Sequence, residues 1–325
     1  MPMEEITPTS ELTATPAANS TRWLLYGLWI VASLGLFLRP LAAVIHFAAN
    51  NDDASHIFLI PFISAGVIFL ERRAIFPRIS YDLGGAAVLA LVAVSVGTAV
   101  SLRHASWSPS QSLSAQMLAL ILIWIAGFIL VFGRAAARAA RFPLLLLVLA
   151  VPLPDFLLAQ VVYFLQKGSA ELVAVLFDLT DTPFLRQGVI FELGRFSIEI
   201  AQECSGIRSS LVLFITSLLA ANLFLKSPWR RIVLVAAVIP LGILRNGLRI
   251  VFIGLLCVHF GPDMIHSIFH KRGGPPFFAL SLIPLFLLLL WLRRNEQKTS
   301  NTQRPAPKAF ASRHPTSNEE AKLAR

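Results

Sequence analysis

One cysteine of this apolar chain has polar neighbours, in the run Gln202-Glu203-Cys204-Ser205-Gly206-Ile207-Arg208-Ser209-Ser210. A long apolar segment follows it, so the sequence predicts that Cys204 lies at the start of a helix. A helix N-terminus and a nearby cation such as Arg208 both favour the thiolate form of cysteine, which makes Cys204 a candidate nucleophile. Two other interpretations stay open. Cys204 could be a small packing residue, or it could form a disulfide with Cys257, the other cysteine of the chain.

Two arginines interrupt a later apolar segment, in Leu244-Arg245-Asn246-Gly247-Leu248-Arg249-Ile250. Arg245 and Arg249 are four residues apart and therefore share one face of a helix. A charge inside a membrane span is costly, so it usually faces the protein interior and has a function. The sequence predicts a charge stabiliser here. A structural ion pair with Glu199 or Glu203 explains either arginine equally well.

A histidine follows in Phe269-His270-Lys271-Arg272-Gly273-Gly274. A thiol nucleophile needs a base that titrates near neutral pH, and histidine has this property. The glycine pair lets the backbone turn His270 inward, although a loop histidine is by default a solvated surface group. His259 and His266 are rival candidates.

Composition indicates a membrane protein. The 325 residues are 56% hydrophobic and 14% charged, with a mean hydropathy of +0.69, whereas a soluble domain carries about 25% charged residues. The net charge of +10 does not indicate a nucleic-acid partner, because the basic residues cluster in short loops and in the C-terminal tail, where they act as topology signals and attract anionic lipid. Metal-ligand spacing and glycine-rich phosphate loops are absent from the sequence, so no cofactor is expected.

The predicted fold is an all-α polytopic membrane protein with about eight transmembrane helices. Runs of about 20 apolar residues, each long enough to cross a bilayer, recur at about 23–45, 56–70, 83–102, 114–133, 142–162, 206–225, 232–258 and 276–292. Pro152 and Pro154 interrupt the fifth run. These segments form a membrane domain over 22–294, between a disordered tail at 1–21 and a disordered basic tail at 295–325.

Basic residues are concentrated in every second loop, which orients the chain. They follow the second, fourth and sixth spans as Arg72, Arg73, Arg78, Arg134, Arg138, Arg141, Lys226, Arg230 and Arg231, and they recur in the C-terminal tail. The positive-inside rule therefore predicts that both termini are cytoplasmic. The same topology predicts that Cys204, Arg249 and His270 meet at the extracytoplasmic face.

The long segment before Cys204 predicts a small β-hairpin on the extracytoplasmic surface. Polar and apolar residues alternate from about 188 to 200, and Gly194-Arg195 suits a two-residue turn. An amphipathic helix is expected at about 166–180, before the hairpin. Ser55 and His56, at the mouth of the second apolar segment, either line a substrate entry or belong to a polar loop, and the polar loop is the simpler interpretation.

These residues together resemble the exosortase/archaeosortase family of membrane-embedded cysteine transpeptidases. The family's three ordered motifs are similar to Glu203-Cys204-Ser205-Gly206-Ile207, to Asn246-Gly247-Leu248-Arg249, and to His270 with Gly274, Phe277 and Phe278. Two further shared motifs resemble Ser55-His56 with Pro61, and Phe142-Pro143 with Pro152-Leu153-Pro154. The resemblance covers about residues 23–292. Pro275-Pro276 stands where relatives more often have a large residue, which keeps His266 as an alternative to His270.

The resemblance implies a thiol protease or transpeptidase of the bacterial inner membrane. Its partners would be membrane lipids and exported proteins that end in a sorting signal, made of a short motif, a transmembrane helix and a basic cluster. Cys204 would form a thioester, His270 would move the proton, and Arg249 would stabilise the oxyanion before transfer to an unknown acceptor. The residues expected to bind the substrate are Arg208, Asn246, Arg245, Ser55 and His56.

The alternative class is a membrane carrier or channel without enzymatic activity. Such a protein would bind an anionic lipid or solute through the intramembrane side chains of Arg245 and Arg249. Cys204 separates the two classes, because an enzyme needs the thiol and a carrier does not.

Overall fold

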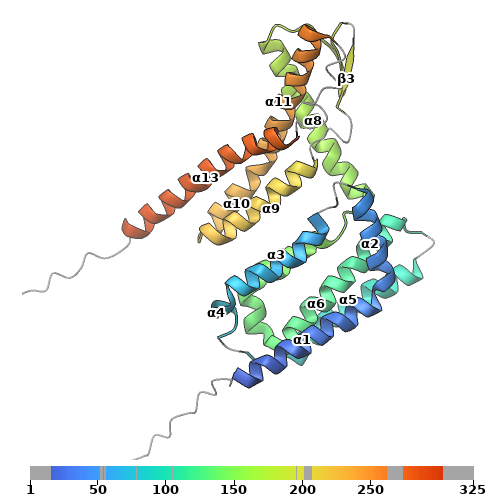
Figure 1. Ribbon diagram of the computed structural model, residues 1–325, viewed down its shortest axis with the longest axis vertical. Coiled ribbons are helices and arrows are strands. Elements are labelled where there is room, and N and C mark those ends of the chain that lie inside the picture. Colours follow the sequence, from blue (N-terminus) through green and yellow to red (C-terminus); the bar gives the residue numbers. More distant parts are fainter. Residues whose placement is uncertain are drawn as a thin grey trace, which may run out of the picture.

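The computed structural model describes residues 16–51, 54, 56–77, 79–103, 106–194, 196–200, 207–261 and 274–302. These residues form helices of very different lengths and one small sheet (Figure 1). The helices are α1 (Pro16–Leu36), α2 (Leu38–Asn50), α3 (His56–Leu70), α4 (Arg72–Ile75), α5 (Leu83–Leu102), α6 (Pro109–Ala139), α7 (Arg141–Leu146), the 3-10 helix η2 (Leu147–Ala150), α8 (Asp155–Leu179), α9 (Ile207–Phe224), α10 (Pro228–Ala236), α11 (Val238–Phe260) and α13 (Gly274–Thr302). The strands are β1 (Leu185–Gln187), β2 (Ile190–Glu192) and β3 (Ser197–Glu199).

The predicted all-α polytopic fold is confirmed, and two of the predicted spans are sharply bent. Among the described residues, five helices are long and apolar enough to cross a membrane, or up to seven spans if each bent helix pair counts as one. The bent pairs are α1 with α2, at 78°, and the α7–η2 segment with α8, at 95°. The second bend lies where Pro152 and Pro154 stand, because proline lacks the N–H group that would continue a helix. The remaining predicted span corresponds to α3, an apolar helix of 15 residues.

Both terminal helices extend beyond the apolar segments. Helix α1 begins at Pro16, within the segment that the sequence assigns to a polar tail, and α13 continues to Thr302. Once a helix is nucleated, each further residue adds a backbone hydrogen bond at little cost, so a helix can continue into polar sequence.

The N-terminal half of the molecule is built around α6. Ser108 caps this helix through a reciprocal pair of hydrogen bonds with Gln111, which satisfies backbone N–H groups that a helix start leaves open. Phe128 and Phe132 are buried on α6 with their ring centroids 4.9 Å apart, and the ring of Tyr26 on α1 contacts both edge-on. Aromatic packing of this kind fixes α1 on α6.

The C-terminal half consists of α8 to α13 and the sheet. Gly168 on α8 faces Ile243, and Gly247 on α11 faces Leu172, and a Cβ added at either glycine would lie 2.7 Å from the facing side chain. Small residues at helix interfaces let backbones approach closely in membrane proteins. Near the C-terminal end of α13, the Glu296 carboxylate accepts hydrogen bonds from the N–H groups of Lys226 and Ser227 at 3.0 and 2.6 Å. These bonds cap the start of α10.

Helix α9 joins the two halves. Ile215 belongs to the apolar core of the N-terminal half, whereas Leu213 and Ala220 pack with α10, α11 and α13. Ile207, the first residue of α9, packs against Val162 and Leu165 of α8. Each face of α9 therefore contacts a different group of neighbours.

The predicted hairpin is present as β2 and β3, and β1 adds a third antiparallel strand. The N–H group of Leu193 donates to the carbonyl of Phe196 at 2.8 Å and closes the β2–β3 turn, where Gly194 has a φ of 71° that favours glycine. Arg195, the second residue of the predicted turn, lies outside the described residues. Phe191 and Ile198, directly opposite each other, are buried against α8 and α11.

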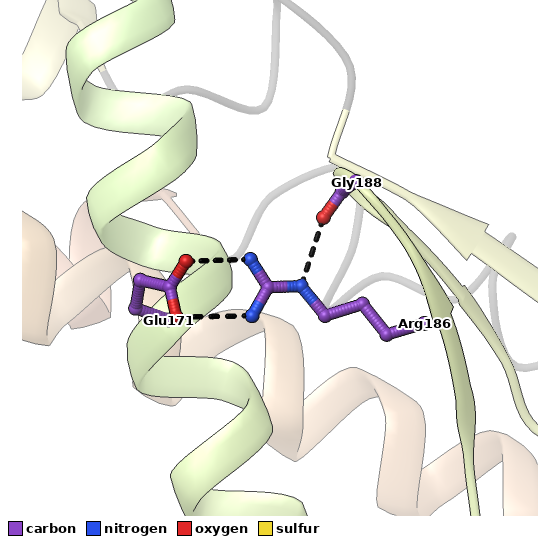
Figure 2. A network of polar contacts seen from close by, with 3 residues as sticks. All are labelled: Glu171, Arg186 and Gly188. Carbon is purple, nitrogen blue, oxygen red and sulfur yellow. Dashed lines mark hydrogen bonds and ion pairs between the residues drawn. The ribbon is translucent and has the colours of Figure 1, made fainter.

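An ion pair fastens the sheet to α8 (Figure 2). The Arg186 guanidinium on β1 donates to both carboxylate oxygens of Glu171 on α8, at 2.8 and 3.1 Å, and its Nε donates to the carbonyl of Gly188 at 2.9 Å. The sheet is thus held beside the C-terminal part of α8.

The predicted amphipathic helix at about 166–180 is the second half of α8, which runs unbroken from Asp155.

Candidate functional site

The arginine motif lies on α11 where this helix contacts both α8 and α9. Arg245 and Asn246 are buried, with 6% and 2% of their surfaces exposed, and Arg249 is half-buried one turn further along. The Arg245 Nη2 atom donates to Ser210 Oγ on α9 at 3.3 Å. The Asn246 Nδ2 atom donates to Ser169 Oγ on α8 at 3.0 Å. The motif therefore holds three helices together through side chains that are polar or charged.

Glycines make these contacts possible. A Cβ added at Gly242 would lie 2.8 Å from Ser210 Oγ, so a larger residue would occupy the space beside the Arg245 contact. On the face of α11 that meets α8, Gly247 leaves space for the side chain of Leu172. The close approach places Ser210 Oγ within reach of Arg245 and Ser169 Oγ within reach of Asn246, so these two pairs form hydrogen bonds away from water.

The described residues on either side of Cys204 both pack beside this motif. Ile200 is fully buried with Ile250 and Val251 of α11, and its carbonyl accepts a hydrogen bond from Gln166 Nε2 of α8 at 2.7 Å. Ile207 is buried against Leu165 of α8. Cys204 itself lies outside the described residues, in the segment 201–206 between these two anchors.

The start of α13 also approaches the motif. The rings of Phe252 on α11 and Phe277 on α13 are 5.9 Å apart, and Phe252 follows Arg249 by three residues. Gly261 ends α11 with a φ of 104°. His270 and its rival His266 lie outside the described residues, in the segment 262–273 between α11 and α13.

A small groove separates α11 from α13 beside Arg245. Its volume is about 200 Å³, and its lining residues are Leu241, Leu244, Arg245, Leu248, Phe277, Leu280, Ser281, Ile283 and Pro284. Nearly all of these side chains are apolar, so Arg245 brings a charge to the wall of an otherwise apolar groove. A guanidinium in such surroundings attracts an anionic or strongly polar group.

The remaining predicted residues do not form part of the contacts between α8, α9 and α11 described above. Arg208 is exposed in the first turn of α9, and His56 is the first residue of α3, a helix of the N-terminal half, while Ser55 lies outside the described residues. Cys257 is free and only 2% exposed on α11, which agrees with a packing role. Glu199, a candidate partner for the arginines, is exposed on β3.

Three polar residues of this site were missed by reasoning from the sequence. Ser169 and Gln166 lie on α8, and Ser210 lies in the first turn of α9, three residues after the end of the cysteine motif. For Ser169, the sequence does contain a signal, which is its position next to Gly168. Ser169 is fully buried beside Gly168, and a small polar residue next to a glycine in an apolar helix is typical of a helix–helix contact.

The chemistry available to this arrangement follows from its side chains. A guanidinium donates several hydrogen bonds in a fixed plane and keeps its charge, so it can hold the oxygen of a carbonyl or an anion as charge develops on it. The amide of Asn246 fixes α11 relative to α8 and thereby the direction from which both arginines extend. A thiolate and a base brought to this place would complete the groups that acyl transfer requires.

Comparison with known proteins identifies the family. Residues 48–287 match the family model described as "Transmembrane exosortase", which is well over half of the chain. No curated protein and no solved structure matches. The chain belongs to the transmembrane exosortase family, as the motifs in its sequence predict.

Proposed function

We propose that this member of the transmembrane exosortase family is a thiol protease or transpeptidase that cleaves the C-terminal sorting signal of exported proteins. The signal would consist of a short motif, a transmembrane helix and a basic cluster. One observation carries the proposal: Ile200 and Ile207, the described residues on either side of Cys204, are both buried against α8 and α11, Ile200 beside Ile250 and Ile207 beside Ile243. The cysteine therefore belongs to a segment that is short and anchored at both ends.

Covalent geometry limits how far Cys204 can lie from these anchors. A fully extended chain advances at most about 3.6 Å per residue, so four residues reach at most about 14 Å from the Cα of Ile200 and three residues at most about 11 Å from the Cα of Ile207. Ile200 packs with Ile250, the neighbour of Arg249 in sequence. An approach of the thiol to the Arg249 side chain is thus compatible with the anchors.

In the proposed reaction the Cys204 thiolate attacks the carbonyl carbon of the scissile peptide bond. The C–N bond breaks, the acyl group stays on sulfur as a thioester, and the leaving amine takes a proton from His270. An acceptor nucleophile, or water, then attacks the thioester, the C–S bond breaks, and the Cys204 thiolate is released. The histidine accepts the proton of this second nucleophile, because the same group serves as acid in one step and base in the next.

Arg249 is proposed to stabilise the negative charge on the carbonyl oxygen during both attacks. Its position three residues after Asn246 places it one helical turn from a side chain that is fixed to α8. A preorganised donor of this kind acts most strongly where water is excluded. Asn246, Arg245, Arg208, Ser55 and His56 are proposed to bind or position the substrate, and Arg245 would do so from the groove between α11 and α13.

The proposed location is the inner membrane of a bacterium, with the reaction at the extracytoplasmic face. Loop charges support it, because basic residues such as Arg72, Arg138 and Arg230 gather at one end of the spans. The substrate would enter the bilayer beside the enzyme, so its transmembrane helix would reach the site laterally.

The decisive experiment uses the full-length enzyme with a tagged exported protein that ends in such a sorting signal. Cys204→Ala, Arg249→Ala and His270→Ala should each abolish processing at normal protein levels, since groups that act as a unit lose nearly everything when one is removed. Cys257→Ala is the matched control and should process at close to the wild-type rate, because its thiol is buried as packing.

A covalent intermediate distinguishes the nucleophile from the other groups. Wild-type enzyme should carry substrate on Cys204 as an adduct that hydroxylamine releases. Processing at the wild-type rate by the Cys204→Ala protein would refute the enzymatic proposal. It would favour the carrier function, which needs the arginines but not the thiol.

A further inference from the structure

A second cavity lies in the N-terminal half, far from the arginine motif in sequence and on different helices. Its volume is about 500 Å³, within the range of about 300–1,000 Å³ that small-molecule sites occupy. The walls come from α1, α3, α6, α7, the start of η2 and the residues around α4. Its lining residues are Trp23, Tyr26, Ile30, Pro61, Ser64, Ala65, Ile68, Phe69, Arg72, Phe76, Trp124, Phe128, Leu144 and Leu147.

The cavity lies between two helices that are anchored on different partners. Helix α1 is fixed on α6, where Trp29 Nε1 donates to the carbonyl of Ile123 at 2.9 Å. Helix α3 is fixed on α7, where Ser64 Oγ donates to the carbonyl of Pro143 at 2.7 Å. Figure 1 shows α4 at the end where the N-terminus of α1 lies. The rings of Trp23 and Phe76, 5.3 Å apart, join the two sides at that end.

Three polar groups of the cavity wall, on Tyr26, Trp124 and Ser64, are already engaged within the protein. Tyr26 donates its hydroxyl to the carbonyl of Trp124 at 3.4 Å, and Trp124 Nε1 donates to Ser33 Oγ at 2.9 Å. The Ser64 hydroxyl is engaged as described above. An occupant therefore meets aromatic rings and aliphatic side chains, which suits a hydrocarbon chain better than a polar metabolite.

A cation lies at the rim. The Arg72 guanidinium stacks over the ring of Phe69 with its Cζ 4.1 Å from the centroid, and its Nη1 donates to the carbonyl of Phe69 at 3.0 Å. These contacts hold the guanidinium beside the opening, and its side chain is exposed. The neighbouring acid, Glu71, accepts a hydrogen bond from Asn222 Nδ2 of α9 at 2.9 Å, which engages its carboxylate with another helix.

We propose that this cavity binds one anionic phospholipid, with an acyl chain between α1 and α3 and the phosphate against Arg72. The amphiphilic shape of the site supports this occupant, because apolar walls meet a single cationic rim where loop charges predict the cytoplasmic surface. Basic pockets between transmembrane helices on that side are suited to anionic headgroups. The exposed rings of Trp23 and Phe69 would flank the lipid at the interface.

Native mass spectrometry of the full-length protein tests the site. The purified protein is exchanged with equal amounts of phosphatidylglycerol and phosphatidylcholine that carry the same acyl chains. Wild-type protein should retain one phosphatidylglycerol in preference to phosphatidylcholine. Arg72→Ala should lower that preference about fivefold, the factor that corresponds to roughly 1 kcal/mol for one basic residue near an anionic headgroup.

Matched variants separate a site from general attraction. Arg73→Ala removes the adjacent exposed cation, which does not line the cavity, and should change the preference much less than Arg72→Ala. Ala65→Phe puts a ring into the cavity and should reduce retention of both lipids, whereas Ala87→Phe, at an exposed alanine on α5, should not. Equal effects of the two arginine variants would overturn the proposal, and so would unchanged retention in Ala65→Phe.

Discussion

The hydrogen bond between Asn246 and Ser169 allows a quantitative test of how the arginine motif is positioned. Asn246 Nδ2 donates to Ser169 Oγ at 3.0 Å, and both side chains are buried, with 2% and 0% of their surfaces exposed. The bond links α11 to α8 at the residue before Gly247, where the two backbones approach closely. Its loss should loosen the helix that carries Arg249.

The expected magnitude comes from the environment of the bond. Hydrogen bonds between transmembrane helices contribute about 0.6 kcal/mol on average, with a maximum of about 1.7 kcal/mol. Because neither partner here reaches solvent, we expect a coupling energy in the upper part of that range, about 1 to 1.5 kcal/mol. Each single substitution should cost somewhat more, since it leaves a buried polar group without its partner.

A double-mutant cycle measures this coupling directly. The free energy of unfolding is measured in detergent micelles for the wild type, Asn246→Ala, Ser169→Ala and the double variant. Ser217→Ala supplies the control cycle with Asn246→Ala, because Ser217 is also fully buried but donates to Phe214 of its own helix at 2.7 Å. That second cycle should show additive effects.

The result that refutes this reasoning is additivity in the first cycle. Independent substitutions add within about 0.3–0.5 kcal/mol, so a coupling energy below that limit would mean that the hydrogen bond does not stabilise the contact. A processing assay on the same variants extends the test. If Asn246 acts by positioning α11, Ser169→Ala should impair processing in the same direction as Asn246→Ala, although Ser169 belongs to another helix.

Three further predictions address topology, reactivity and packing. Reporter fusions after Arg78 and after Lys271 should report opposite compartments, because basic residues mark the cytoplasmic loops. A membrane-impermeant maleimide should label Cys204 from outside faster than Cys257, whose side chain is 2% exposed. Gly247→Val should destabilise the protein by about 1 to 3 kcal/mol in thermal unfolding, because the new side chain overpacks the contact between α11 and α8.

Each of these predictions has a clear contrary outcome. The same compartment for both fusions would reject the predicted topology and the shared extracytoplasmic face. Faster labelling of Cys257 would contradict its burial. Gly66→Ala is the control for the glycine variant, since a Cβ there meets nothing within 4 Å, and an equal loss of stability in both variants would reject the packing argument.

The helices were predictable from the sequence because a bilayer imposes a length and a composition on each span. The boundaries of α3 and α5 agree with the predicted segments at both ends, since polar or turn-forming residues flank clean apolar runs. The bend in the first predicted span, after Leu36, lies four residues before Pro40, which has no N–H group to donate to the Leu36 carbonyl and whose ring crowds that carbonyl. The size of the bend also depends on how α1 and α2 each pack against α6, which a single sequence does not show.

The charged residues of the candidate site stand out in the sequence, whereas the residues that they contact do not. Arg245, Asn246 and Arg249 attract attention in an apolar segment because an intramembrane charge is costly. Ser169 and Ser210 do not, because a serine in a membrane helix can satisfy its own hydroxyl on the preceding turn. Their role depends on the approach of α8 and α9 to α11, and only the folded chain brings these helices together.

The mounting of α9 has a consequence for how the protein can move. Its residues Ile207, Leu213 and Ile215 belong to three separate packing clusters, so α9 is held by packing contacts at several points along its length. A shift of α9 would break contacts in both halves at once, whereas a swing of α13 would disturb one cluster. A relative movement of the two halves would therefore have to bend or displace the helix that follows the cysteine motif.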